Sequence, residues 1–121
     1  MIHILLATIR QEAIQTFTDC LALDSEIRLD QVTSGSEALT FVRTKCPHLV
    51  IVDSELPDTK PLDLVRKIIN ANAMVNTVVV SPLPNEDFHV KSEGLGVLCR
   101  LPPDLGWSEA DGLLKKLRSV L

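Results

Sequence analysis

Short apolar segments alternate with longer amphipathic segments from one end of the chain to the other. Apolar runs of strand length, which are typical of buried parallel strands, cover residues 2–7, 49–52, 77–81 and 97–101. Residues 27–30 alternate apolar and polar side chains, as an edge strand does. The intervening segments have apolar residues at helical spacing and span residues 9–23, 38–42, 61–69 and 107–121. Residues 85–93 favour a short, poorly amphipathic helix. This strict alternation predicts an α/β domain with a parallel sheet.

Polar residues and a proline indicate where helices begin. Thr8–Gln11 and Ser34–Glu37 have capping-box spacing, in which two side chains bind backbone N–H groups at a helix start. Pro61 suits the first turn of the helix that follows it. We therefore expect one domain over residues 1–121, with a flavodoxin-like doubly wound (βα)5 fold. Its five parallel strands should have the order 2-1-3-4-5, and the helix at 85–93 should be the shortest.

Composition and charge exclude several classes of function. The net charge of −4 and the lack of a Lys/Arg cluster are unlike a nucleic-acid-binding surface. No apolar segment is long enough to span a membrane, and the N-terminus lacks signal-peptide features, so we expect a cytoplasmic protein. Cys20, Cys46 and Cys99 lack CxxC spacing and are interpreted as reduced thiols. No histidine has metal-ligand spacing with acidic residues, and we expect neither an enzyme nor a bound cofactor.

Asp53 is the candidate for a functional residue, because it follows the third apolar run directly. In open α/β sheets, ligands bind at the carboxyl ends of the strands, where Asp53 is expected to lie. Ser81 ends the fourth run, and Leu101-Pro102 ends the fifth. With these residues the whole chain resembles the receiver domain of two-component response regulators. The resemblance implies that Asp53 is the phosphoacceptor, that Ser81 matches the Ser/Thr that binds the phosphoryl group, and that the Leu101–Pro102 peptide bond is cis.

Three positions depart from the receiver pattern. Receivers hold Mg²⁺ with two adjacent acidic residues after the first strand, and this chain has Ala7-Thr8 there. The receiver lysine aligns with Leu101. If any metal binds, Asp53 and the Glu55 carbonyl would be its ligands. Because phosphoryl transfer depends on positioning and charge neutralisation, we expect no metal site and weak or no phosphorylation. Arg100 should not replace the lysine, because neighbouring residues of a strand face opposite sides.

Three functional hypotheses remain open. In the first, the chain is a degenerate receiver that binds a signalling protein, an output domain or a second copy through residues 85–121. In the second, it is a working receiver that accepts phosphate at Asp53 from a sensor kinase, with Mg²⁺ in an atypical site. In the third, it binds a small ligand in the crevice of the fold. For single residues there are structural alternatives too: Asp53 as the polar end of a strand, Ser81 as a turn residue and Thr8 as a helix cap.

Overall fold

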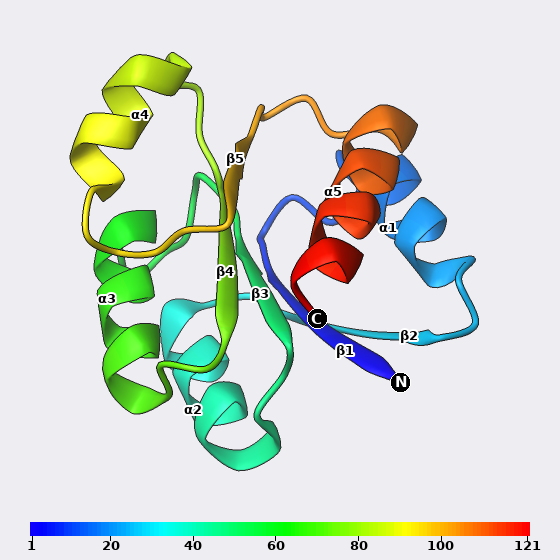
Figure 1. Cartoon of the computed structure of the whole chain (residues 1–121), viewed down its shortest axis with the longest axis horizontal. Helices are drawn as coiled ribbons and strands as arrows, with labels where there is room; N and C mark the ends of the chain where they lie inside the picture. Colours follow the sequence, from blue (N-terminus) through cyan, green and yellow to red (C-terminus); the bar gives the residue numbers. More distant parts are fainter.

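The chain forms five strands and five helices in strict alternation. A computed structural model describes all residues, 1–121 (Figure 1). In chain order the elements are β1 Ile2–Ala7, α1 Gln15–Ala22, β2 Ile27–Val32, α2 Gly35–Lys45, β3 Leu49–Val52, α3 Pro61–Ala71, β4 Asn76–Val80, α4 Asn85–Ser92, β5 Cys99–Leu101 and α5 Trp107–Val120. No helix is long and apolar enough to cross a membrane.

The five strands form one parallel sheet in the order β2-β1-β3-β4-β5, as predicted. Ala7, at the end of β1, pairs with Val32 of β2 and Val52 of β3. The carboxyl ends of the central strands therefore lie level with one another. This register brings the loops after β1 and β3 to the same edge of the sheet, although they are far apart in the sequence.

Helices cover both faces of the sheet, with α1 and α5 on one side and α2, α3 and α4 on the other (Figure 1). Alternate residues of β1 enter two separate cores: Ile4 and Leu6 belong to the cluster with α1 and α5, and Leu5 and Ala7 to the cluster with α2 and α3. All four are fully buried. A strand buried on both faces is apolar throughout, because its side chains alternate between two cores.

The predicted capping box before α2 forms in part. Ser34 is the N-cap, and its hydroxyl oxygen accepts the Glu37 N–H over 3.1 Å. The Glu37 carboxylate binds the N–H and hydroxyl of Thr33 instead of the Ser34 N–H. Asp58, from the loop before α3, accepts the N–H groups of Gly35 and Ser36 at 2.8 and 3.0 Å. Two loops therefore satisfy the donors at the start of α2.

The prediction of a helix from residue 9 capped by Thr8 was wrong, because α1 begins at Gln15 and residues 11–14 form turns. The Thr8 hydroxyl does accept the Arg10 N–H over 2.9 Å, but its own hydrogen goes to Asp53. That long-range contact holds residues 8–10 as a loop. The fourth helix is also not the shortest alone, since α4 and α1 have eight residues each.

The prediction of a cis Leu101–Pro102 bond was also wrong, because the chain contains no cis peptide bond. Trans is the lower-energy isomer of an X–Pro bond. The lysine that accompanies the cis bond in receivers is absent here, which removes one reason for that geometry. Leu101 is instead buried in the core that faces α5.

Candidate functional site

Asp53 is the first residue after β3 and is completely buried at the carboxyl edge of the sheet. Its N–H donates to the Ala7 carbonyl over 3.0 Å, which continues the pairing of β3 with β1. The backbone of Asp53 is therefore fixed by the sheet. A buried carboxylate needs hydrogen-bond donors or a cation to offset its lost hydration.

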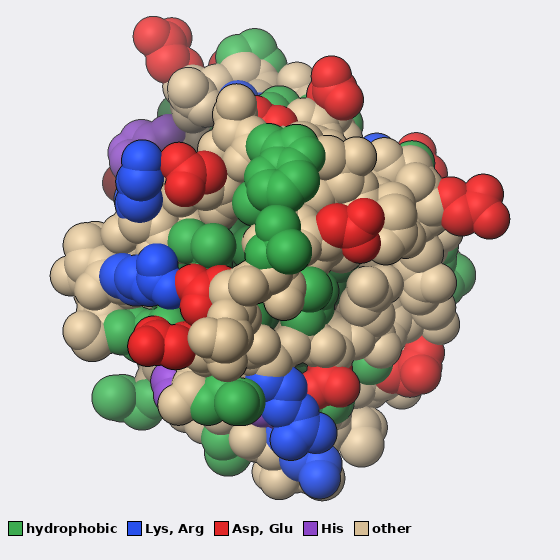
Figure 2. All heavy atoms as spheres, turned by 90° about the vertical axis from the view of Figure 1, so that its right-hand side faces the viewer, with side chains coloured by type: hydrophobic (Ala, Val, Ile, Leu, Met, Phe, Trp, Pro, Cys, Tyr) green, Lys and Arg blue, Asp and Glu red, His purple; other side chains and the backbone are tan.

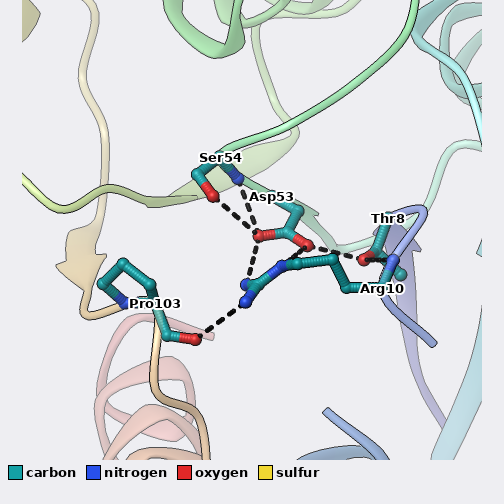
Figure 3. Close-up of polar contacts among 5 residues, drawn as sticks. All are labelled: Thr8, Arg10, Asp53, Ser54 and Pro103. Atoms are coloured by element: carbon teal, nitrogen blue, oxygen red, sulfur yellow. Dashed lines mark hydrogen bonds and ion pairs between the residues drawn. The ribbon is translucent and has the colours of Figure 1, made fainter. Parts of the chain in front are cut away.

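Arg10 supplies that cation from the loop after β1. Its Nε donates to Asp53 Oδ2 over 2.8 Å, and its Nη2 donates to Oδ1 over 2.6 Å (Figure 3). This is a two-pronged arginine–carboxylate pair, the strongest common geometry for such an interaction. About a quarter of the Arg10 side chain remains exposed, whereas Asp53 has no exposed surface.

Two further residues complete the environment of the carboxylate. The Thr8 hydroxyl donates to Oδ2 over 2.6 Å, and the Ser54 N–H donates to Oδ1 over 2.7 Å. A weaker contact joins the Ser54 hydroxyl to Oδ1 at 3.4 Å. Arg10 also donates from Nη1 to the Pro103 carbonyl over 3.2 Å, which ties the loop before α5 to the same centre. The Arg10–Asp53 pair thus connects three loops at the edge of the sheet (Figure 3).

Burial alone would raise the pKa of Asp53, because it disfavours the charged form. The hydrogen bonds from Arg10, Thr8 and Ser54 outweigh burial and hold the pKa of Asp53 below its ordinary value. The same contact raises the pKa of the Arg10 guanidinium. The pair is therefore ionised on both sides at neutral pH.

The other predicted site residues lie around this edge, but their side chains do not bond to the Asp53 carboxylate. Ala7 and Leu101 are buried in the two opposite cores. Ser81 is buried, and its hydroxyl oxygen accepts the Leu83 N–H over 3.2 Å, which is the contact of a turn residue. Pro102 is half-buried, and Glu55 is exposed.

Arg100 makes no bond to Asp53. Its guanidinium donates to the Ser81 carbonyl over 2.6 Å and to Asn85 Oδ1 over 2.8 Å. It therefore joins β5 to the start of α4, on the opposite face of the strand from Leu101, as strand alternation predicted.

Sequence reasoning overlooked Arg10, the residue that defines the site. The available signal was a single arginine three residues after a strand end, in the first loop of a fold whose crevice contains Asp53. Placing residues 9–23 in one helix concealed that signal.

The residues at this edge do not fit a Mg²⁺ site. Magnesium requires oxygen ligands in near-octahedral geometry and retains its waters strongly. Ala7 offers no ligand, the Thr8 hydroxyl hydrogen points at Asp53, and both Asp53 oxygens already accept hydrogen bonds from an arginine. No three His, Cys, Asp or Glu side chains of the chain come together as a metal-binding group.

Comparisons with known proteins identify the fold. No protein-family model and no curated protein matches the sequence, but many solved structures match the architecture. A CheY-like receiver domain from Methanospirillum hungatei JF-1 has a TM-score of 0.83 at 15% identity, covering 98% of this chain and 95% of that one. The HemR receiver domain of Leptospira biflexa has a TM-score of 0.80 at 22% identity, covering 99% and 94%.

The chemotaxis response regulator CheY4 of Vibrio cholerae is similar over nearly its whole length, with a TM-score of 0.83 at 13% identity and coverage of 97% and 98%. Structural similarity at such low identity establishes the fold and does not transfer residue roles. The chain has the flavodoxin-like fold of response-regulator receiver domains.

Proposed function

We propose that this chain is a receiver-like signalling module in which Arg10 blocks the acceptor aspartate, and that it acts by binding protein partners. The observation that carries the proposal is the two-pronged ion pair between Arg10 and Asp53. Signalling by a receiver fold is supported by the solved receiver domains that share the architecture. On this proposal the module works in the cytoplasm.

The ion pair opposes phosphorylation for a direct physical reason. To attack a phosphoryl donor, an Asp53 oxygen must be free and the developing charge must be neutralised. Here each oxygen accepts two strong hydrogen bonds, and breaking a hydrogen bond to a charged group costs roughly 1.5–3 kcal/mol. An incoming phosphoryl group would also find few backbone donors, because the Ser54 N–H already binds Asp53 and Pro82 has no N–H.

One observation favours the working-receiver alternative. Arg10 is a partly exposed cation beside the acceptor, so it could turn and meet phosphoryl oxygens in the role that receivers give to a lysine. Phosphorylation chemistry separates the two functions. The protein is incubated with Mg²⁺ and acetyl phosphate for intact-mass measurement, and with beryllofluoride for ¹⁹F NMR, beside a receiver of known activity and the Asp53→Asn variant.

We expect no phosphoryl adduct and no bound beryllofluoride in the wild-type protein. An adduct that disappears in Asp53→Asn would establish the working receiver and reject the blocked one. In that case Arg10→Ala should slow phosphorylation, whereas under our proposal Arg10→Ala is the variant in which any trace of reactivity should appear.

Partner binding is assigned to the surface formed by α4, β5 and α5, within residues 85–121. α4 buries only Phe88 and exposes Val90, and α5 exposes Trp107 at its first turn. On the side of α1 and α5, hydrophobic side chains reach the surface among scattered charges of both signs (Figure 2). The partner is a signalling protein, an output domain or a second copy.

Phosphorylation-independent association has a simple test. Light scattering and pull-down with candidate partners should show weaker association for Val90→Glu or Trp107→Ala. Met74→Glu is the control, since Met74 is a hydrophobic residue more exposed than Val90 or Trp107 but lies between α3 and β4. Association that requires acetyl phosphate, or that Met74→Glu weakens as much as Val90→Glu, would reject this surface.

A further inference from the structure

A cavity of about 490 Å³ lies between the first turn of α3, the end of β4 and the inner face of α4. α3 and α4 are neighbours on the same face of the sheet (Figure 1). We refer to this cavity as the α3–α4 cavity. Its volume falls within the range of about 300–1,000 Å³ that is typical of small-molecule sites. Neither Asp53 nor Arg10 lines it, so it is distinct from the ion pair described above.

The inner wall of the α3–α4 cavity is apolar. Val79 and Phe88 are buried side chains that line it, together with Leu83 from the loop after β4. Water in contact with such a wall makes few hydrogen bonds. An apolar group that replaced this water would therefore bind favourably.

The rim of the cavity is positively charged, although the chain as a whole is negative. Lys60 precedes α3, Lys91 lies in the last turn of α4, and neither forms an ion pair. Arg66 forms an ion pair, with an N–O distance of 3.2 Å, with Asp63, the one carboxylate of the lining. The surplus of positive charge favours an anionic ligand.

Neutral donors without acceptors lie in the same cavity. Ser81 is more than nine-tenths buried, and its hydroxyl hydrogen has no acceptor in the chain, because its one bond uses the oxygen as acceptor. The first turn of α3 adds the N–H groups of Leu62 and Asp63, which no carbonyl or side chain accepts, and the N-cap residue provides no side-chain cap. Free N–H groups at a helix start, beside a buried hydroxyl whose hydrogen has no acceptor, suit an anionic group.

We propose that the α3–α4 cavity binds a small amphipathic anion: one carboxylate, sulfonate or phosphate head group held by Lys60, Lys91, Ser81 and the start of α3, and an apolar body against Leu83 and Phe88. The site works whether or not Asp53 accepts phosphate, so it goes beyond the proposed function. Failure of either proposal leaves the other standing.

Anilinonaphthalene sulfonate is a suitable probe, because it has an apolar body and one anionic group and fluoresces when bound. We expect saturable binding of one probe per folded chain. Phenylnaphthylamine, which keeps the body but lacks the charge, should bind about tenfold more weakly. Lys60→Gln and Lys91→Gln should each weaken probe binding about threefold, and together about tenfold, which is the usual effect of exposed charges.

Lys45→Gln is the matched control, since Lys45 is an exposed lysine at the end of α2 and should leave the affinity unchanged. Circular dichroism and cooperative thermal unfolding show that each variant is folded, because the probe also binds loosened proteins. Amide shifts in ¹⁵N NMR should concentrate at residues 60–66, 79–83 and 88–91. The proposal is overturned by shifts centred on Trp107, by equal affinity for the uncharged probe, or by a double lysine variant that binds as well as the control.

Discussion

Replacing Arg10 with alanine measures how strongly the chain holds its own acceptor aspartate. The change leaves a completely buried carboxylate with only the Thr8 hydroxyl and the Ser54 N–H as close donors. Removing one partner of a buried pair costs about 3–5 kcal/mol. Because Arg10 is about a quarter exposed, water can enter the vacated space and reduce that cost. We expect Arg10→Ala to lower the free energy of unfolding by about 2–3 kcal/mol at pH 7, or the melting temperature by about 10 °C.

The pH dependence of this loss gives a sharper test than its size. The folded-state pKa of Asp53 lies below its ordinary value, so the pair contributes stability above the unfolded-state pKa. That contribution disappears as the pH falls through the lower, folded-state pKa. Without Arg10, burial becomes the main influence and should raise the pKa of Asp53, so the variant should take up a proton on folding in mild acid. The difference between wild type and Arg10→Ala should therefore be largest near neutral pH and shrink as the pH falls toward 4.

The assay is urea unfolding of four proteins between pH 4 and pH 8: the wild type, Arg10→Ala, Asp53→Asn and the double variant. Asp53→Asn should cost less than Arg10→Ala, about 1–2 kcal/mol, since the freed guanidinium can turn toward water. The double variant should cost about 1–2 kcal/mol less than the sum of the single ones. Additive effects, or an Arg10→Ala loss that does not change with pH, would refute the reasoning that a buried, charged pair organises this edge.

Three other predictions test separate parts of the structure. Gly35→Ala should destabilise the protein by about 1–3 kcal/mol, because a Cβ there would lie 2.5 Å from a side-chain methyl of the loop before α3. Gly112→Ala, in open space on α5, should stabilise the protein by about 1 kcal/mol, and thermal unfolding measures both variants. Asp58→Asn should lower the melting temperature at pH 7 but not in strong acid, because backbone N–H groups hold the pKa of Asp58 below its ordinary value and that stability is lost as the carboxylate protonates. Combining Thr8→Asp with Arg10→Ala should create Mg²⁺ binding, measurable by calorimetry, because it removes the hydrogen bonds of Thr8 and Arg10 from the Asp53 oxygens and adds a second carboxylate; wild-type protein should show none.

The fold was predictable from local pattern because a doubly wound sheet buries its central strands on both faces. The apolar runs that became β1, β3 and β4 have few alternatives, and a parallel sheet places their ends along one edge. The position of Asp53 followed from the same geometry. A residue that directly follows a buried strand must lie at the carboxyl edge, whatever its partners are.

The start of α1 and the partner of Asp53 were not predictable in this way. The spacing of Thr8 and Gln11 is compatible both with a capping box and with a loop, and the local sequence cannot decide between the two. The deciding contact joins Arg10 to a residue 43 positions away, so it exists only once β1 and β3 are paired. The α3–α4 cavity was not predictable from the sequence for a similar reason, since its walls come from α3, β4, α4 and the loops beside them.

The origin of the positive charge beside Asp53 determines what kind of input the domain can receive. In the receiver pattern that this chain resembles, the charge comes from a metal ion that can leave and a lysine that meets the phosphoryl group. Arg10 is part of the chain and is held by Asp53 and Pro103, so its charge is present in every molecule at all times. A signal that works by bringing positive charge to Asp53 would then change the charge around this carboxylate little. Under our proposals, information must enter elsewhere, through a partner on residues 85–121 or through an anion in the α3–α4 cavity. Only the second route places the ligand against Ser54, whose N–H binds Asp53. If the bound probe changes the coupling energy between Arg10 and Asp53 in the double-mutant cycle, the α3–α4 cavity is energetically connected to the Arg10–Asp53 ion pair.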